Sequence, residues 1–489
     1  MKTHRPIAIL AIALVTVTLA GCSFTRRAID VYTPPPFALD GGPSFDGSIP
    51  ERGGVTRLDM NRGNCMALQC QQSGCSAGAC TGPKCSGTDK TTVTGTVYDP
   101  AGKVPLYNVT VYVPNTALNP LTEGASCDCE TSISGSPVVA ATTDAKGQFT
   151  LEDVPVGSNI PLVIQVGKWR REAVIPAVSG CTNTAVDASL TRLPKNQSEG
   201  HIPRIALTTG GLDALECLLR KIGIVDTEFT PEAGTGRVNL FAGGNHLGMP
   251  MAGTSAGTNS YDPTLNGGAT FTDAETWWET ADNLNKYDII LHSCEGTERP
   301  TNKSVNARMA LQTYADAGGR VFASHWHNYW IEQGAAPWPT VAQFNHQRDP
   351  MSPFTATIDT SFPKGMAMAA WLTNVGASTT PGQLVIQGAK RTVQAVNIAQ
   401  RWIYSDATMP PSVQYFSFNA PVGATKQCGK VVFSDLHVSA GAGGATNDSS
   451  APAKPFPTGC VTTELSPQEK ALEFMLFDLS TCVSEPIIY

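Results

Sequence analysis

The sequence predicts two folded domains, a small β domain followed by an α/β domain with a mostly parallel sheet. Three observations support this prediction. The chain has 489 residues, which is more than one hydrophobic core usually supports. Residues 91–166 alternate between apolar and polar side chains, as strands buried on one face do. From residue 202 onward, short apolar runs alternate with helical patterns, which is typical of a parallel sheet covered on both faces.

Composition and charge exclude several classes of protein. Charged residues make up 15% of the chain and hydrophobic residues 41%, so it is not a highly charged disordered chain. Lys plus Arg number 34 against 41 for Asp plus Glu, which gives a net charge of −7. This acidic balance, together with the absence of a polybasic segment, argues against nucleic acid as a partner.

The N-terminal segment predicts secretion and a lipid anchor. Basic residues precede an apolar run over 7–20, which is too short for a transmembrane helix but suits a signal peptide. The run ends in LAGC, which resembles the lipobox of bacterial lipoproteins. The resemblance implies that residues 1–21 are removed as a signal peptide and that Cys22 is lipidated. Ser23 follows in place of Asp, which implies a lipid-anchored protein of the cell envelope, held in the outer membrane.

A linker and a cysteine-rich segment are predicted next. Residues 22–60 are rich in Pro and Gly and have no regular period, which indicates a flexible linker. Residues 61–89 contain five cysteines at intervals of five, namely Cys65, Cys70, Cys75, Cys80 and Cys85. No His lies among them, so disulfides are favoured over a zinc site in an oxidising compartment. Beyond Cys22, 13 of the 14 cysteines remain, so at least one is free, intermolecular or metal-bound.

The β domain is predicted over residues 90–193. Alternating valines flank the turn sequence DPAG, and a second turn, TDAKGQF, precedes further alternating segments. The sequences VTGTVYDPAGKVPLYNVTVYV, TTDAKGQFTLEDVPVG and IPLVIQVGKW resemble the carboxypeptidase regulatory-like family, whose fold is a transthyretin-like β-sandwich. The resemblance implies a module that accompanies catalytic or surface proteins. Because these residues include no His, they cannot supply a carboxypeptidase-type zinc set by themselves.

The α/β domain is predicted over residues 203–482. Buried strands are indicated by apolar runs at 202–208, 287–291, 321–323 and 429–433. Helical spacing over 212–222 and 305–317 predicts two helices, and the second ends at a Gly-Gly pair. Ser466, with Glu469 three positions later, predicts a capping box at the start of a final helix.

Polar side chains gather where three of these strands end. His292, Cys294 and Glu295 follow the strand at 287–291. His325 and His327 follow the strand at 321–323, and Asp435 and His437 follow the strand at 429–433. In open α/β sheets, ligands bind at the carboxyl ends of the strands. We therefore predict a ligand-binding site formed by His292, Glu295, His325, Trp326, His327 and His437.

A family resemblance covers most of this domain. The sequences YDIILHSCEG, LQTYADAGGRVFASHWH and GKVVFSDLHV resemble the class I glutamine amidotransferase-like fold, a flavodoxin-like fold, and within it the ThuA-like branch. In that branch the strand after a Gly-Gly pair ends in a histidine, which His325 matches. Relative to the branch, this chain has long insertions, which include residues 237–283 and much of 330–425. The elbow that carries the nucleophilic cysteine in glutaminases reads ASHWH, and the glutamate of the His-x-Glu pair is replaced by Ser439. Amidotransferase activity needs both groups and is rejected.

Cys294 is open to two interpretations. It follows a strand beside His292 and Glu295, so it could be a nucleophile with a base in reach. In a secreted protein a disulfide is preferred, and Cys217 is the candidate partner.

Two functions of different class remain open for the predicted site. A surface binding module would hold a carbohydrate or peptide ligand against Trp326 and its aromatic neighbours. A metal-dependent hydrolase would use His325, His327 and His437 to hold a divalent metal such as zinc, which activates water. The first two of these histidines are two apart, which on an extended backbone puts both rings on one side. The missing thiol and glutamate favour the binding module, and no catalytic residue is assigned.

The lipobox predicts that the protein is attached to a membrane. Because Cys22 carries the predicted anchor, Cys22→Ala should move the protein to the soluble fraction once signal processing is bypassed. Detergent phase partitioning measures this directly. Wild-type protein that partitions into the aqueous phase would contradict the anchor.

Overall fold

The computed structural model describes residues 65–73, 81–128, 133–210, 213–243, 259–407, 409–437, 454–460 and 464–483. All of them belong to one compact unit, Glu51–Tyr489. The predicted signal peptide, the lipidation site Cys22 and the linker lie outside the described residues. None of the helices in the described ranges combines the length and the apolar character needed to cross a membrane.

Residues 92–185 form two sheets, which we call the β region. The three-stranded sheet has the order β4-β1-β7 and consists of β1 (Thr92–Thr96), β4 (Gln148–Glu152) and β7 (Asn183–Ala185). The four-stranded sheet has the order β3-β2-β5-β6 and consists of β2 (Thr110–Pro114), β3 (Pro137–Thr142), β5 (Gly157–Val166) and β6 (Trp169–Val178). Alternate side chains of both sheets, such as Val93, Val111 and Ile164, are buried in one core. The alternation in the sequence correctly predicted β1 to β5, whereas β6 and β7 were not predicted.

The turn before β4 follows from its sequence. The Asp144 carboxylate accepts hydrogen bonds from the backbone N–H groups of Lys146 and Gln148, each at 2.8 Å. Gly147 has a φ of +72° and lies against Pro105, where a Cβ atom would be crowded. The Asp and Gly of this turn are therefore needed by its geometry.

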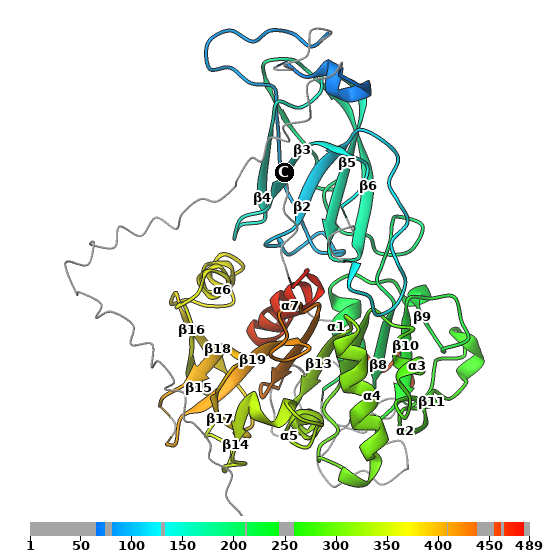
Figure 1. Cartoon of the computed structure of the whole chain (residues 1–489), viewed down its shortest axis with the longest axis vertical. Helices are drawn as coiled ribbons and strands as arrows, with labels where there is room; N and C mark the ends of the chain where they lie inside the picture. Colours follow the sequence, from blue (N-terminus) through cyan, green and yellow to red (C-terminus); the bar gives the residue numbers. More distant parts are fainter. Residues whose placement is uncertain are drawn as a thin grey trace, which may run out of the picture. The chain divides into compact units, whose positions relative to one another are not determined.

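The α/β region is built on one eleven-stranded sheet, whose main path has the order β11-β10-β8-β12-β13-β20-β19-β18-β15-β16 (Figure 1). Its parallel part consists of β8 (Ile205–Thr208), β9 (Phe229–Thr230), β10 (Val238–Ala242), β11 (Thr272–Asp273), β12 (Ile289–His292), β13 (Arg320–Ser324) and β20 (Gly429–Ser434). Its antiparallel part consists of β15 (Phe354–Ile358), β16 (Gln383–Ile386), β18 (Gln400–Ser405) and β19 (Ser412–Ala420). Residues 330–425, treated above as an insertion, thus extend the sheet. They also form a separate pair, β14 (Ala342–Phe344) and β17 (Val393–Val396).

Helices cover both faces of this sheet, as the alternating sequence pattern predicts. One face packs against α1 (Leu215–Lys221), α6 (Pro363–Asn374) and α7 (Pro467–Ser480). The other packs against α2 (Ala274–Trp277), α3 (Ala281–Leu284), α4 (Val305–Asp316) and α5 (Tyr329–Glu332). Neighbouring residues of β8 divide between the faces, since Leu207 joins the first core and Ala206 the second. The predicted capping box of the last helix, between Ser466 and Glu469, is confirmed.

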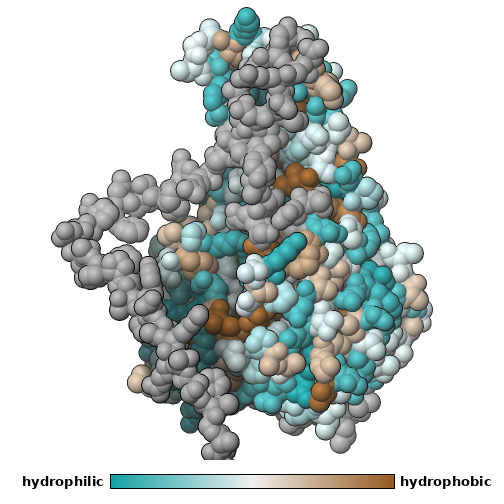
Figure 2. Space-filling model, in the orientation of Figure 1, coloured by the Kyte–Doolittle hydropathy of each residue, from teal (hydrophilic) through white to brown (hydrophobic). Residues whose placement is uncertain are grey.

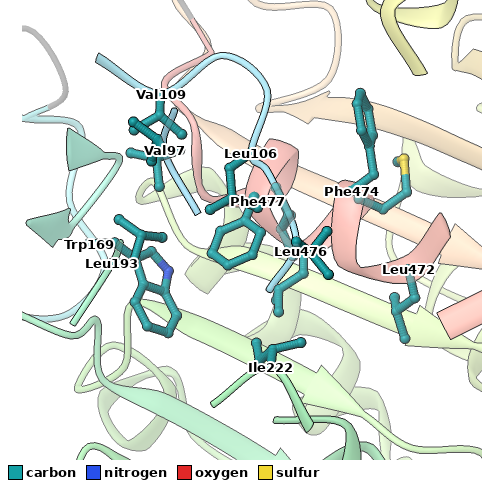
Figure 3. Packing of buried hydrophobic residues seen from close by; sticks show 14 of the residues in the cluster. Val97, Leu106, Val109, Trp169, Leu193, Ile222, Leu472, Phe474, Leu476 and Phe477 are labelled. Atoms are coloured by element: carbon teal, nitrogen blue, oxygen red, sulfur yellow. The ribbon is translucent and has the colours of Figure 1, made fainter. Parts of the chain in front are cut away.

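Helix α7 also packs against the β region. The rings of Trp169 and Phe477 lie 5.8 Å apart edge to face, and those of Tyr107 and Phe474 stack at 5.7 Å. Figure 3 shows Leu106 next to Phe477 in the same group of buried side chains. Each such buried side chain contributes about 1.5–3 kcal/mol of hydrophobic stabilisation.

Disulfides connect distant parts of the chain. The bonds are Cys65–Cys70, Cys85–Cys181, Cys127–Cys428 and Cys217–Cys460, and Cys482 is also disulfide-bonded. The prediction of disulfides in the cysteine-rich segment is confirmed for Cys65, Cys70 and Cys85, whereas Cys75 and Cys80 lie outside the described residues. The suggested Cys217–Cys294 bond is wrong, because Cys217 pairs with Cys460 and Cys294 is a buried free thiol.

The coloured residues in Figure 2 are mostly polar or neutral, and hydrophobic ones occur in small groups. The large hydrophobic side chains that are exposed, including Met351 and Met409, are spread along the described parts of the chain. Single exposed apolar residues of this kind are normal for a protein surface.

Two acidic side chains are buried where α7 meets the β region. Burial raises the pKa of Asp99 to about 6. Burial, reinforced by the nearby Asp99, raises the pKa of Glu473 well above its ordinary value. Neither carboxylate oxygen of Glu473 has a hydrogen-bond partner among the described residues.

From these two carboxyl groups we predict that the free energy of unfolding falls as pH rises. The folded state keeps their protons to higher pH than the unfolded chain does, so stability falls from about pH 4 upward through the folded pKa values. Glu473→Gln should therefore raise the free energy of unfolding at pH 8 by about 1–3 kcal/mol. Urea unfolding at pH 5 and pH 8 measures the gain, with the exposed Glu172→Gln as the control. A gain that is equal at both pH values would contradict the assignment.

Candidate functional site

The parallel strands bring the predicted residues to one edge of the sheet. β8, β12, β13 and β20 are neighbours in that order. Thr208 pairs with His292, and His292 pairs with Ala323, so these strands end at nearly the same level. The side chains that follow them divide into two groups. We call Asp213, Cys294, His325 and His437 the Asp213 cluster, and His292, Glu295, Lys303, His327 and Trp330 the Trp330 cluster.

The Asp213 cluster is centred on a carboxylate between two imidazoles. Asp213 Oδ2 lies 3.1 Å from His325 Nδ1, and Asp213 Oδ1 lies 3.6 Å from His437 Nδ1. The two imidazole rings are in contact, with centroids 3.8 Å apart. The side chains of Asp213 and His325 are fully buried, whereas that of His437 is 20% exposed. The cluster therefore reaches solvent through His437.

Cys294 completes the cluster. One ligand atom each from Asp213, Cys294 and His325 lies within 4.8 Å of the other two, and all three residues are buried. Gly210, in the loop that leads from β8 to Asp213, lies so close to the Cys294 backbone that a Cβ atom would clash with it. Glycine at this position thus allows the two strand ends to approach each other.

The backbone at His325 is strained. His325 begins the 3₁₀ helix η6 (His325–Asn328) directly after β13 and has a φ of +39°. A non-glycine residue with a positive φ destabilises the fold by about 1–3 kcal/mol, and such strained residues are concentrated at functional sites. The strained turn points the His325 ring at Asp213.

Burial and charge set the protonation of the cluster. Burial, helped by His437 and opposed by Asp213, lowers the pKa of His325 to about 4. Although burial disfavours the charge of Asp213, the adjacent His325 and His437 hold its pKa below the usual range. Burial raises the pKa of the Cys294 thiol well above its ordinary value. At neutral pH the cluster therefore contains a carboxylate, a neutral His325 and a protonated thiol, and the thiol is a poor nucleophile.

The two nitrogens of His325 have different surroundings. Its Nδ1 lies 3.1 Å from Asp213 Oδ2. Its Nε2 is buried and has no hydrogen-bond partner among the described residues. An imidazole oriented by a carboxylate, with its other nitrogen free, can bind a metal or accept a proton.

The Trp330 cluster is a packed, buried network. His327 Nε2 lies 2.8 Å from the Ser293 carbonyl oxygen, and Trp330 Nε1 donates to His327 Nδ1 at 2.9 Å. The His327 ring stacks on His292 with centroids 4.7 Å apart. His292 Nδ1 lies 3.1 Å from Thr208 Oγ1. Burial lowers the pKa of both histidines well below the usual range, which keeps both rings neutral.

Glu295 belongs to the same network. It forms a fully buried ion pair with Lys303, whose Nζ also lies over the rings of Trp278 and Trp330 at 5.6 and 5.7 Å. The predicted site residues His292, Glu295 and His327 are thus brought together with one another. Glu295 and His327 have partners that stabilise the fold, whereas His292 Nε2 is buried without a hydrogen-bond partner among the described residues.

The structure does not bring the three predicted metal ligands together. His325 and His437 are in contact, but His327 has both ring nitrogens engaged in the other cluster. The expectation that His325 and His327 lie on one side assumed an extended backbone. That assumption is wrong, because both residues belong to η6, and residues two apart on a 3₁₀ helix point in different directions.

The aromatic residue of the predicted site lies near the surface. Trp326 is half-buried, and Lys390 Nζ lies 5.2 Å from the centre of its ring. Lys390 also pairs with Asp349 at 2.7 Å.

Sequence reasoning missed Asp213. The sequence contained a signal for it, because Asp213 follows the TTGG sequence at the end of β8. β8 is a buried parallel strand like the three strands whose ends were predicted to form the site. Asp435 also follows one of the predicted strands, but it is not part of the cluster. Its carboxylate accepts a hydrogen bond from the backbone N–H of Thr392 at 2.9 Å.

Comparisons with known proteins give little further information. No protein-family model matches the chain, and no match is found among curated proteins. Among solved structures, a ThuA-like protein from Bacteroides uniformis ATCC 8492 is 12% identical, with a TM-score of 0.24, over 48% of this chain and 82% of its own. A chain of a type II cohesin–X-dockerin complex from Acetivibrio cellulolyticus is 18% identical, with a TM-score of 0.15, over 34% of this chain and 86% of its own. Likenesses at these TM-scores do not support an argument about fold or function.

The Trp330 cluster makes a prediction about stability. Lys303→Met should lower the free energy of unfolding by about 3–5 kcal/mol, because it leaves the Glu295 charge buried without its partner. Lys286→Met is the matched control, since its ion pair with Glu232 is partly exposed and should contribute less than about 1 kcal/mol. Urea unfolding compares the two variants. Equal losses would show that the buried pair has no special role in the fold.

Proposed function

We propose that this chain is a metal-dependent hydrolase whose site is the Asp213 cluster. One observation carries the proposal. Asp213, Cys294 and His325 come from three different strand ends, are buried together, and present ligand atoms within 4.8 Å of one another. Buried polar groups are ordinarily hydrogen-bonded, so the unpartnered His325 Nε2 supports a bound group at this point.

The donor set suits a transition metal such as zinc. Thiolate sulfur, imidazole nitrogen and carboxylate oxygen are the three ligand types that zinc takes in proteins. When bound, such an ion lowers the pKa of a coordinated water and so provides a nucleophile near neutral pH. The raised pKa of Cys294 means that binding would release its proton.

The remaining side chains support hydrolysis at the same place. His437 touches His325 and is partly exposed, so it is placed to carry a proton between the buried groups and solvent. Trp326 and Lys390 lie where part of a substrate could stack and pair with a positive charge.

A binding module without catalysis is the second candidate. It is favoured by the half-buried Trp326, whose ring could stack on a carbohydrate or peptide ligand. We also infer the finer identities suggested by the sequence. The β region would be a carboxypeptidase regulatory-like sandwich, the α/β region a ThuA-like domain, and the whole chain a lipoprotein of the outer membrane.

The test is metal content. Untagged protein from zinc-supplemented medium should contain stoichiometric zinc by mass spectrometry. His325→Asn should remove the zinc and keep the fold, because Asn tolerates a positive φ. The same variant should lose hydrolysis of any substrate found in a panel of nitrophenyl esters and glycosides.

The control is His201→Gln, which changes a histidine outside both clusters and should retain zinc. Equal zinc in the wild type and His325→Asn would exclude the Asp213 cluster as the metal site. If the wild type contains no zinc and Trp326→Ala weakens binding to a carbohydrate array, the binding module is the better account.

A further inference from the structure

The segment over residues 388–390 lies beside the point where the Asp213 cluster reaches solvent. It runs antiparallel to the residues that follow β20. The His437 N–H donates to the Gly388 carbonyl at 2.9 Å, and the Lys390 N–H donates to the Asp435 carbonyl at 2.8 Å. These two backbone bonds hold Lys390 at a fixed position next to the cluster.

The same pairing places the side chains of Lys390 and His437 on one face. Side chains alternate between faces along an extended segment, and residues opposite each other share a face. Gly388 lies opposite His437, and Lys390 is two residues further along, whereas Ala389 and Leu436 are buried on the other face. A Cβ atom on Gly388 would lie 3.4 Å from His437 Cδ2. A molecule that reaches His437 over this glycine would therefore meet Lys390.

The Lys390 ammonium lies between an aromatic ring and a carboxylate. Its Nζ is 5.2 Å from the centre of the Trp326 ring and 2.7 Å from Asp349 Oδ2. Burial is the main cause of the lowered pKa of His325, and the charges of His437 and Lys390 act in the same direction. Because interactions between charges weaken with distance, the ammonium is close enough to act on groups at the cluster.

This ammonium can bind a further group. An ammonium has three N–H donors, and among the described residues Asp349 is the only hydrogen-bond partner of Lys390 Nζ. The contact with Asp349 shows that a carboxylate fits at this position. The Asp349 side chain is 49% exposed, so its pair with Lys390 contributes little to stability, and another carboxylate could replace it. One ammonium beside an aspartate matches the single charge of a carboxylate better than the double charge of a phosphate.

We propose that the substrate of the Asp213 cluster carries a carboxylate that binds Lys390, next to a ring or apolar group that stacks on Trp326. The inference rests on the proposed function, because it concerns the same site. The Trp326 ring offers a flat apolar face to such a group, and the ammonium selects for charge. Uronic acids and the C-terminal ends of peptides both have this chemistry. Asp349 competes with the substrate carboxylate for the ammonium.

The two members of the ion pair should therefore respond differently to substitution. Lys390→Met removes the group that binds the carboxylate, and it should weaken binding. Asp349→Asn removes the competing carboxylate, and it should strengthen binding. Both side chains are partly exposed, so both variants should fold. If the pair only stabilised the loop, the two variants would behave alike.

The test is binding to the full chain, measured by isothermal titration calorimetry with probes that differ in one carboxylate. Phenyl 1-thio-β-D-glucuronide is compared with the corresponding glucoside, and N-acetylphenylalanine with its amide, which distinguishes a sugar acid from a peptide end. In at least one comparison the wild type should bind the anionic probe about tenfold more tightly than the neutral one. Lys390→Met should abolish this preference, and Asp349→Asn should increase it about threefold.

The matched controls are Lys286→Met and Glu232→Gln, which change an ion pair before β12, at the opposite end of that strand from the cluster. Both should leave the preference unchanged. The proposal would be overturned if the wild type showed no preference for the anionic probes. Equal effects of Lys390→Met and Asp349→Asn, or an equal loss in Lys286→Met, would also overturn it.

Failure of this inference can be distinguished from failure of the proposed function, because zinc content and hydrolysis of nitrophenyl substrates are measured separately. Hydrolysis by a zinc-containing protein that shows no preference for anionic probes would contradict only the inference. Preferential binding of the anionic probes through Lys390, without zinc or hydrolysis, would contradict only the hydrolase. The carboxylate would then be the ligand of the binding module.

Discussion

Helix α7 is buried on two opposite sides, and both the β region and the α/β region depend on this burial. Its apolar side chains contact the sheet of the α/β region on one side and the β region on the other. An isolated amphipathic helix needs only one apolar stripe, whereas a helix that is apolar around most of its surface must be covered from two directions. Its polar side chains bond to neighbouring elements, for example Asp478 to Lys364 and Lys430. The packing and the ion pairs together fix where α7 lies.

The site depends on a different constraint, the common direction of β8, β12, β13 and β20. Parallel strands end at the same edge, so the residues after each strand are brought together whatever their separation in sequence. The role of each side chain at this edge depends on its hydrogen-bond partners. Histidines whose nitrogens are all bonded, such as His327, become part of the core. Groups left with a free buried nitrogen, such as His325, keep the capacity to bind or react. Two clusters that differ in their hydrogen bonding can thus form side by side at one edge.

Local patterns allowed much of the fold to be predicted. Helix α4, the capping box at Ser466 and the alternating strands of the β region depend on neighbouring residues, and these matched the structure. The antiparallel part of the sheet was missed, because strand direction depends on connections that periodicity does not contain. The pairing of Cys217 with Cys460 was missed for a similar reason, since 243 residues separate them. Within the site, the tight turn at His325 decides which ring points where, and only the backbone geometry reveals that turn.

The disulfides have a consequence for a chain that is cut. Cys85–Cys181, Cys127–Cys428 and Cys217–Cys460 overlap along the sequence, so at least one of them spans every peptide bond between residues 85 and 460. A protease that hydrolyses one bond in this range leaves two fragments that are still covalently joined. The fragments then stay at a high local concentration of each other, and their shared core can re-form after each opening. The folded unit should therefore survive nicking with its architecture intact until its disulfides are reduced.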